Sequence, residues 1–251
     1  MAESSPSRPV WIDLSTSDAA AARDFYSAVM GWDVVVSPDP QYGGYAMARV
    51  DGHDVAGIGP AQPGAPTAWS LYIHSSDAAG LGERVKTAGG TVVAPAFPVG
   101  DIGRMAVFQD PSGAFISAWE PLGMEGFVGS GPGHFHYAQL NARGVERAIP
   151  FYQQVFGWTA TAMPGWDGSS YTQFSVDGTP FAGAAEMTSM VPAEVPSFWQ
   201  LFFAVDDVDA AHQRAVDHGG TSIMPPTDAP GARVALVQDP QGAVFALHKV
   251  V

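Results

Sequence analysis

The chain has 251 residues, a net charge of −14 and no cysteine, and these values exclude several classes of protein. The negative charge argues against nucleic-acid backbones and anionic membranes as partners, because both need basic surface. The absence of cysteine excludes disulfides, thiolate metal ligands and cysteine nucleophiles. No apolar run approaches the roughly 18 residues of a membrane span, and the first residues lack a secretory signal. We therefore expect a cytoplasmic protein with neither nucleic-acid nor membrane partners.

The first half of the chain alternates short apolar runs with helical patterns. A tail over residues 1–9 is expected to be disordered, and residues 10–16 read as a strand. Ser17 or Asp18 then caps a helix that Gly31 ends. The other strands predicted in this half are residues 32–36, 45–50, 55–58, 69–74, 91–93, 104–109 and 114–119.

Turn signals and a second helix divide these strands. Asp51-Gly52 is predicted to form a hairpin turn, and residues 110–113 a turn between the last two strands. A helix is predicted over residues 77–88, closed by Gly89-Gly90. The half therefore reads as two βαβββ units in succession.

The second half follows the same plan, with Asp177-Gly178 as its hairpin turn. Its first helix contains Pro150, which removes a backbone hydrogen bond, so we expect that helix to begin late, near Pro150 itself. A further helix is predicted over residues 207–217. The predicted strands are residues 135–141, 158–161, 171–176, 181–185, 198–205, 221–224, 233–238 and 243–249. The chain thus contains four βαβββ units, paired two by two.

The two halves are copies of one sequence pattern. FYSAVMGW, from residue 25, reappears as FYQQVFGW from residue 151, and DPSGAFISAW, from residue 110, reappears as DPQGAVFALH from residue 239. Between these motifs AGGTVV matches HGGTSI, in the same order and with similar spacing. We therefore predict domains over residues 10–120 and 134–251, joined by a glycine-rich linker over residues 121–133.

These motifs resemble the vicinal-oxygen-chelate superfamily, which includes glyoxalase I, bleomycin-resistance proteins, fosfomycin-resistance enzymes and extradiol dioxygenases. The resemblance covers nearly the whole chain and is greatest to the tandem two-domain proteins of actinobacteria. It implies an α+β fold of two glyoxalase-like domains, each pairing two βαβββ units into a curled sheet around a cup. In the metal-using members three ligands, usually His, His or Gln, and Glu, project into that cup.

Counting along the family's pattern gives the ligand positions in this chain. They are Trp11, Ser70 and Ser117 in the first half and Tyr137, Gln200 and Ala246 in the second. A divalent cation of this class needs about three imidazole or carboxylate donors converging on one point, and neither set provides them. We therefore expect cups that bind no metal and no cofactor.

Strand alternation predicts which side chains line each cup. The first set is Trp11, Asp13, Ser15, Ser70, Tyr72, His74, Ser117 and Trp119, and the second is Tyr137, Gln139, Asn141, Gln200, Phe202, Ala246 and His248. Aromatic walls with few polar groups suit a small organic ligand, often a flat one.

Asp13 with His74 is the main candidate for catalysis, because a carboxylate can orient an imidazole and raise its basicity. The alternative is that Asp13 satisfies a backbone donor and His74 lies at a wet rim. His248 is a candidate for acting alone in the second cup. His134 and His136, with Glu186 or another acid as a third ligand, are a weaker candidate for a surface metal pair.

Two functions remain open, and they leave open whether the chain is an enzyme. One is a metal-independent pocket protein that moves protons on a bulky, partly aromatic metabolite, in an isomerisation, cyclisation or hydration of secondary metabolism. The alternative is a non-catalytic drug- or metabolite-binding protein, like the bleomycin-resistance proteins. A metal-dependent lyase or dioxygenase is the least favoured. We expect a monomer, with a dimer as the alternative, because a tandem chain can pair its units internally.

Overall fold

The computed structural model describes residues 7–164, 169–189 and 191–250. Within these ranges it is an α+β protein with four α-helices and two eight-stranded mixed sheets. The helices are α1 (Ala19–Met30), α2 (Ala78–Thr87), α3 (Val145–Phe156) and α4 (Val208–Asp217), with a short 3₁₀ helix η1 (Pro40–Tyr42). None of these helices is long and apolar enough to cross a bilayer.

Each half of the chain supplies one sheet. The first, ordered β2-β3-β4-β1-β5-β8-β7-β6, contains β1 (Pro9–Thr16), β2 (Asp33–Val36), β3 (Ala46–Val50), β4 (His53–Pro60), β5 (Ala68–His74), β6 (Thr91–Val99), β7 (Gly103–Gln109) and β8 (Phe115–Pro121). The second, ordered β10-β11-β12-β9-β13-β16-β15-β14, contains β9 (Phe135–Ala142), β10 (Thr159–Pro164), β11 (Ser170–Val176), β12 (Thr179–Glu186), β13 (Phe198–Ala204), β14 (Thr221–Ala229), β15 (Ala232–Gln238) and β16 (Val244–Val250). The two orders are the same, as the repeat predicts.

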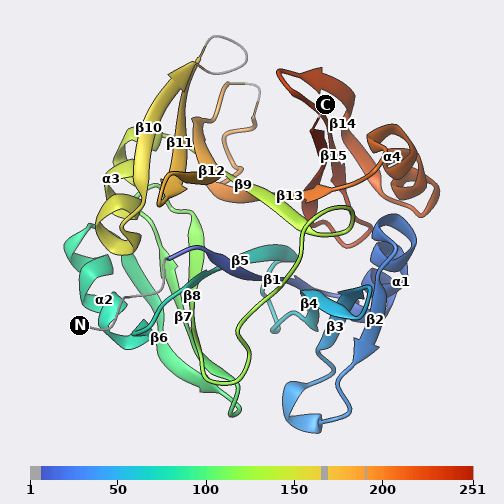
Figure 1. Cartoon of the computed structure of the whole chain (residues 1–251), viewed down its shortest axis with the longest axis horizontal. Helices are drawn as coiled ribbons and strands as arrows, with labels where there is room; N and C mark the ends of the chain where they lie inside the picture. The colour runs from blue at the N-terminus through green and yellow to red at the C-terminus, as the bar shows by residue number, and fades with distance from the viewer. Residues whose placement is uncertain (1–6, 165–168, 190, 251) are drawn as a thin grey trace. The chain divides into compact units, whose positions relative to one another are not determined.

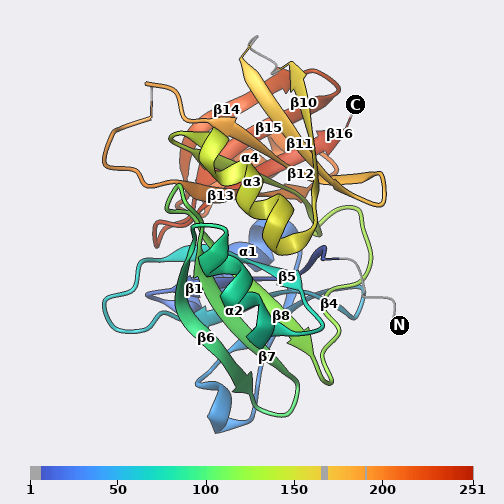
Figure 2. The same cartoon turned by 90° about the vertical axis from the view of Figure 1, so that its left-hand side faces the viewer.

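The packing divides the chain differently from the repeat, because each compact body takes segments from both halves. Body 1 comprises Met1–Val10, Leu71–Gly126 and Ala138–Gln200, and body 2 comprises Trp11–Ser70, Phe127–Tyr137 and Leu201–Val251. Body 1 therefore contains α2 and α3, and body 2 contains α1 and α4. Within each body the two helices lie beside one another (Figures 1 and 2).

Helix α1 begins and ends where its sequence predicts. Asp18 caps it, because its carboxylate accepts from the backbone nitrogens of Ala20 and Ala21 at 3.1 and 3.0 Å. Gly31 ends it at φ 73°, a left-handed conformation that favours glycine. The hairpin turns are also as predicted, with positive φ at Asp51-Gly52 and at Asp177-Gly178.

The prediction of a late start for α3 was wrong, since the helix runs from Val145 to Phe156 with Pro150 inside it. Pro150 removes only the hydrogen bond that its N–H would donate to the Glu146 carbonyl. The Glu186 carboxylate stabilises the start of the helix, accepting from the backbone nitrogens of Gly144 and Val145 at 2.8 Å each. The buried side chains that follow in the helix offset the cost of the proline.

Strands β6 and β14 extend further than predicted, through prolines that a central strand would exclude. They run to Val99 and Ala229, and each is the last strand in the order of its sheet. An edge strand needs hydrogen bonds on one side only, so it tolerates residues without an N–H. Both strands also shift register against their neighbours, β6 at Ala94.

A buried tyrosine joins the two halves of the chain within each body. In body 2 the Tyr26 hydroxyl donates to Asp239 Oδ2 at 3.0 Å and accepts from Trp69 Nε1 at 3.0 Å. In body 1 Tyr152 makes the same bonds with Asp110 at 2.7 Å and with Trp199 at 2.9 Å.

The two aspartates of these clusters open the DPxG turns, and their second carboxylate oxygen holds the turn. Asp110 Oδ1 accepts from the backbone nitrogens of Ser112 and Ala114, and Asp239 Oδ1 from those of Gln241 and Ala243. Burial raises the pKa of Tyr26, Tyr152 and Asp239. In each body, the tyrosine of the FY motif of one half therefore binds the aspartate of the DPxG motif of the other half.

Parts of the predicted tail and linker make specific contacts. Residues 1–6 of the tail lie outside the described residues, whereas Ser7 accepts a hydrogen bond from Trp158 Nε1 at 2.6 Å. Arg8 donates to the Val176 carbonyl at 3.1 Å. In the linker, the ring of Phe127 stacks on Trp11 with centroids 6.4 Å apart. Its closing residue, Gly133, accepts from Trp32 Nε1 at 2.7 Å.

Candidate functional site

The predicted face of β1 carries a hydrogen-bonded cluster in body 2. Core residues Ile12 and Leu14 alternate with Trp11 and Asp13, which therefore lie on the opposite face. Trp11 Nε1 donates to the Tyr45 hydroxyl at 2.9 Å, and that hydroxyl donates to Asp13 Oδ2 at 3.4 Å. Trp11, Tyr45 and Asp13 are called the Tyr45 cluster below.

Tyr45 reaches this position because the neighbouring strand has no side chains beneath its ring. Asp13 lies opposite Gly57 in the parallel pairing of β1 with β4. A Cβ added to Gly57 would come within 1.7 Å of the Tyr45 hydroxyl oxygen, and one added to Gly59 within 2.9 Å of the ring. Glycines two apart on one strand mark such a close approach, and this was the signal that sequence reasoning overlooked.

Burial and the charge of Asp13 together keep Tyr45 protonated. Burial contributes most to raising the pKa of the Tyr45 hydroxyl well above its usual value, and the Asp13 carboxylate raises it further. The hydroxyl is therefore a neutral hydrogen-bond donor at physiological pH. Its 3.4 Å contact with Asp13 is long for an O–H···O bond.

Four predicted site residues of β5 and β8 lie in body 1, whereas Ser70 of β5 lies in body 2. Tyr72, Ser117 and Trp119 are buried and His74 is half-buried, with His74 opposite Trp119 in the parallel pairing. The His74 Nδ1 atom is buried and has no hydrogen-bond partner among the described residues. Asp13 belongs to body 2, so the Asp13–His74 pair stays a prediction.

Another glycine, Gly103, leaves the space that the Trp119 ring fills. A Cβ on Gly103 of β7 would come within 2.2 Å of the Trp119 ring, whose Nε1 donates to the Met124 carbonyl at 2.7 Å. In the second half Ala232 and His248 take the positions of Gly103 and Trp119. The smaller imidazole leaves room for a side chain where the indole does not.

The second-half candidates also divide between the two bodies. In body 1 Gln200 is buried, and Gln139 Nε2 donates to Asn141 Oδ1 at 2.8 Å. In body 2 Ala246 is fully buried and Tyr137 meets Phe202 edge-on, with centroids 6.1 Å apart. The exposure of Ser70 is intermediate.

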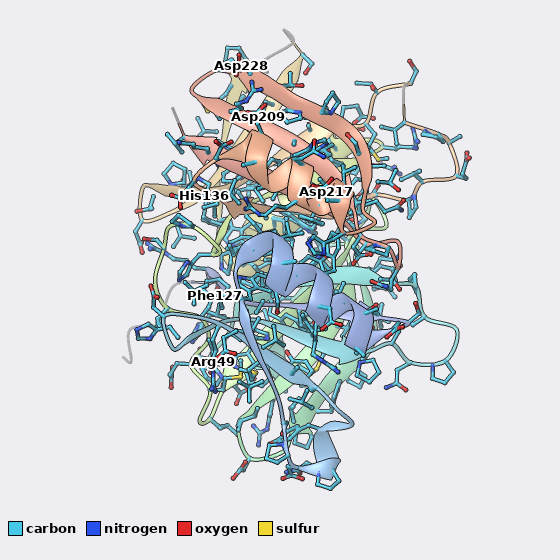
Figure 3. The ribbon with its side chains drawn as sticks, turned by 90° about the vertical axis from the view of Figure 1, so that its right-hand side faces the viewer. Arg49, Phe127, His136, Asp209, Asp217 and Asp228 are labelled. Atoms are coloured by element: carbon cyan, nitrogen blue, oxygen red, sulfur yellow. The ribbon has the colours of Figure 1, made fainter. Side chains whose placement is uncertain are left out.

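His248 has a partner that sequence reasoning did not assign to it. Its ring stacks on that of His136, with centroids 4.7 Å apart and planes at 17°, and the ring of Phe202 meets it edge-on. Burial and, to a smaller extent, the neighbouring His136 lower the pKa of His248 to about 4, and burial also lowers the pKa of His136. Both imidazoles are therefore neutral at pH 7 (His136 is labelled in Figure 3).

Other charged groups have structural partners. Arg233 pairs with Asp209 of α4 and Asp228 of β14 on the surface of body 2 (Figure 3). Its counterpart Arg104 pairs with Glu120 at 3.1 Å. Glu186, predicted as a third ligand beside His134 and His136, instead binds the start of α3.

The residues at the expected metal-ligand positions do not fit a cation. Trp11 donates its indole N–H to Tyr45, and Ala246 has no donor atom. Within the described ranges no group of three His, Cys, Asp or Glu side chains is placed to hold a metal ion.

Comparisons with known proteins agree with this fold. The chain is 37% identical to the "Anthracycline biosynthesis protein DnrV" of Streptomyces peucetius, over 98% of this chain and 94% of that protein. It is 36% identical to the "Putative glyoxylase CFP32" of Mycobacterium tuberculosis, over 96% and 94% of the two chains.

Solved structures show the same fold at low identity. The 2,3-dioxygenase LapB from Pseudomonas sp. KL28 matches with a TM-score of 0.68 and 16% identity, over 96% of this chain and 91% of that one. The Mn(II)-bound glyoxalase from Novosphingobium aromaticivorans matches with a TM-score of 0.68 and 15% identity, over 98% and 83%. A family model matches residues 8–117 and again residues 134–247. The chain belongs to the Glyoxalase/Bleomycin resistance protein/Dioxygenase superfamily.

Proposed function

We propose that this protein binds a bulky, partly aromatic metabolite and transfers a proton on it without a metal ion. The observation that carries the proposal is the Tyr45 cluster, in which a neutral phenol and a carboxylate lie on one strand face beside an indole ring. The relative named for anthracycline biosynthesis supports a polycyclic aromatic substrate. The Trp11–Phe127 stack supports it also, because aromatic walls favour flat ligands.

The cluster has the two groups that an isomerisation needs. Asp13 accepts a proton from a carbon next to a substrate carbonyl, while the Tyr45 hydroxyl donates a hydrogen bond to the carbonyl oxygen as it becomes an enolate. Return of the proton from Asp13 to a different carbon completes the isomerisation. No electrons leave the substrate, so the step needs no oxidant or reductant. His74 is the second candidate proton carrier.

Hydrogen exchange into an aryl ketone tests the chemistry directly. We expect the protein to accelerate deuterium uptake from D₂O into 1-tetralone, followed by mass spectrometry. Asp13→Asn should slow this exchange by about 100-fold or more, because it removes the base. Binding of the ketone, followed by tryptophan fluorescence, should be unchanged in this variant.

Three further variants test which residues take part in the exchange. Tyr45→Phe should slow exchange by roughly tenfold or more, since it removes the donor to the developing enolate. Tyr171→Phe changes the equivalent tyrosine of the second half and should leave the exchange rate unaltered. His74→Ala, in the same assay, tests whether that imidazole takes part.

The alternative function is a non-catalytic binder of such molecules. Tight binding of 1-tetralone and larger aryl ketones, with no exchange above the buffer rate, would exclude the catalytic proposal and support the binder. Elemental analysis tests the metal-free part of the proposal. One tightly held transition-metal ion per half, retained after dialysis against a chelator, would overturn it.

A further inference from the structure

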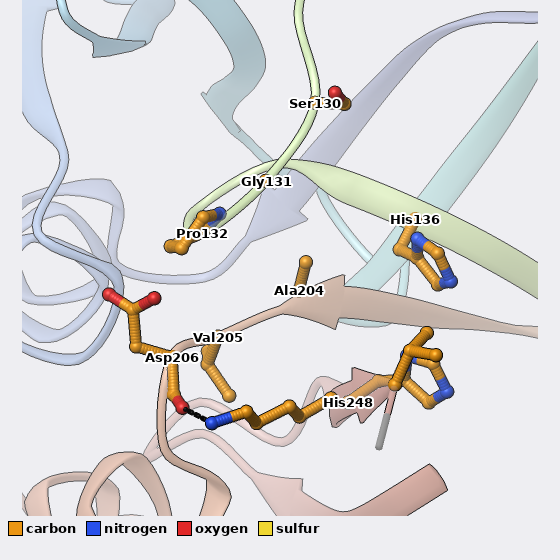
Figure 4. A pocket seen from close by; sticks show the side chains of 10 residues that line it. Ser130, Gly131, Pro132, His136, Ala204, Val205, Asp206 and His248 are labelled. Carbon is orange, nitrogen blue, oxygen red and sulfur yellow. Dashed lines mark hydrogen bonds between the residues drawn. The ribbon is translucent and has the colours of Figure 1, made fainter. Parts of the chain in front are cut away.

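Body 2 has a pocket that shares no residue with the Tyr45 cluster. It has a volume of about 390 Å³ and lies between the linker, the end of β13 and the end of β16 (Figure 4). Its lining includes Ser130 and Pro132 of the linker, His136 of β9, Asp206, and His248 and Lys249 of β16. This volume falls within the range of small-molecule sites, which begins at roughly 300 Å³.

The geometry of the two histidines makes a stacking surface and argues against a metal chelate. An imidazole lone pair lies in the plane of its ring, and the two planes are nearly parallel with centroids 4.7 Å apart. Lone pairs in such planes do not converge on one point about 2 Å from both rings, as chelation requires. Both rings are also neutral at pH 7. The pair is therefore a flat, uncharged surface.

The polar groups of the pocket are mainly hydrogen-bond donors. The His248 Nδ1 atom is buried without a partner among the described residues. Because an unpaired N–H is rarer in proteins than an unpaired acceptor, we assign the proton to Nε2, which makes His248 a donor at that atom. Lys249 Nζ donates one proton to the Asp206 carbonyl and retains two.

Both charged groups of the pocket lie at its Asp206 end. Lys249 carries the positive charge of the lining, and Asp206 carries the negative one. Figure 4 shows the Asp206 carboxylate pointing away from the two imidazoles, while the Asp206 carbonyl holds the lysine. The ammonium therefore lies at the Asp206 end of the pocket, and the two imidazoles lie at the other end.

From this geometry we infer that the pocket binds a planar aromatic carboxylate. The aromatic ring stacks on His136, and the carboxylate pairs with Lys249. The site is independent of the proposed proton transfer, since it uses other residues and needs no reaction.

Three small molecules test the inference on the whole protein. We expect 2-naphthoate to bind at one site by isothermal titration calorimetry, and to shift the ring-proton NMR signals of His136 and His248. Its uncharged counterpart 2-naphthamide should bind roughly fivefold more weakly, because it lacks the ion pair with Lys249. Cyclohexanecarboxylate should also bind roughly fivefold more weakly, because it cannot stack.

Matched variants locate the site. Lys249→Met and His136→Leu should each weaken 2-naphthoate binding by roughly fivefold. His53→Leu, at an exposed position of a hairpin, should have no effect. Asp13→Asn should leave the affinity unchanged, which separates this pocket from the Tyr45 cluster.

Three results would overturn the inference. The first is no detectable binding of 2-naphthoate. The second is equal affinity for 2-naphthoate and 2-naphthamide. The third is binding that Lys249→Met and His136→Leu leave intact but Asp13→Asn alters, because the ligand would then occupy the site of the proposed proton transfer.

Discussion

The tyrosine–aspartate clusters and the predicted ligand faces are both repeated in this chain, but only the clusters repeat their chemistry. Tyr26 and Tyr152 have the same two partners in the same order. On the ligand faces, by contrast, the residues at equivalent positions of the repeat differ. Tyr137 replaces Trp11 in the second half, and His248 replaces Trp119. The repeat therefore keeps the hydrogen bonds that join the two halves, whereas the residues on the predicted ligand faces differ between the halves.

The physical reason lies in what each position must satisfy. A buried carboxylate that holds a turn and a tyrosine leaves several unpaired groups if it is lost. A residue on the ligand face has to match only the neighbour beneath it, as Trp119 matches Gly103, and the second half has Ala232 and His248 at these two positions. Such pairs can change together.

The largest effect is expected from removing either aspartate of the clusters. Asp110→Ala and Asp239→Ala should each lower the free energy of unfolding by about 3 kcal/mol, because each leaves a tyrosine hydroxyl and two backbone N–H groups unpaired. Urea denaturation followed by tryptophan fluorescence measures this. If one variant cost far less than the other, the clusters would not be equivalent.

A second prediction concerns the glycine beneath Trp119. Gly103→Ala should cost about 2 kcal/mol of stability, because the added methyl group overlaps the indole ring. Combining it with Trp119→His should restore most of that loss, since this recreates the Ala232–His248 pair. A double-mutant cycle gives the coupling energy. Additive losses would show that glycine and tryptophan are not a matched pair.

Alkaline pH tests the two tyrosines together. Their pKa values are raised in the folded protein, so their contribution to stability is complete below the ordinary tyrosine pKa of 10.0 and is lost as pH rises through the folded values. Above pH 10 each should lower the unfolding free energy by about 1.4 kcal/mol per pH unit.

Variants assign this pH dependence to single residues. Tyr26→Phe and Tyr152→Phe should each remove the part of the slope that belongs to one tyrosine. The measurement is urea denaturation between pH 8 and 11. A slope that both variants leave unchanged would mean that other groups control alkaline unfolding.

The smallest effect is expected at Pro150 of α3. The equivalent residue of α1 is Asp24, which keeps its N–H. Pro150→Ala should raise stability by about 1 kcal/mol, because the regained hydrogen bond exceeds the entropy that proline removes from the unfolded chain. Thermal unfolding measures the change. A loss of stability would show that the packed helix already accommodates the proline.

Much of the architecture could be predicted because its signals are local. The Asp18 cap, the Gly31 stop and the two Asp-Gly hairpins depend on residues adjacent in sequence. Alternation along β1 placed Trp11 and Asp13 on the face opposite the core. The predicted start of α3 was wrong because Glu186, which stabilises the observed start, is 41 residues from Val145 in the sequence.

The candidate sites were predicted in part for the same reason. Asp13 and His248 are candidates because of their positions on their strands, whereas Tyr45 and His136 were not predicted as their neighbours. Tyr45 reaches Asp13 only because Gly57 and Gly59 leave space on β4, and His136 meets His248 from another strand of the sheet. Such contacts depend on strand pairing across many residues.

The sequence by itself determined the repeat and the four βαβββ units, since these follow from residue types at fixed spacings. Only the tertiary structure decided that each compact body combines segments of both halves, with Tyr26 against Asp239 and Tyr152 against Asp110. The reason is that two similar halves offer nearly identical packing surfaces. A pattern along the chain cannot indicate which copy a tyrosine will meet.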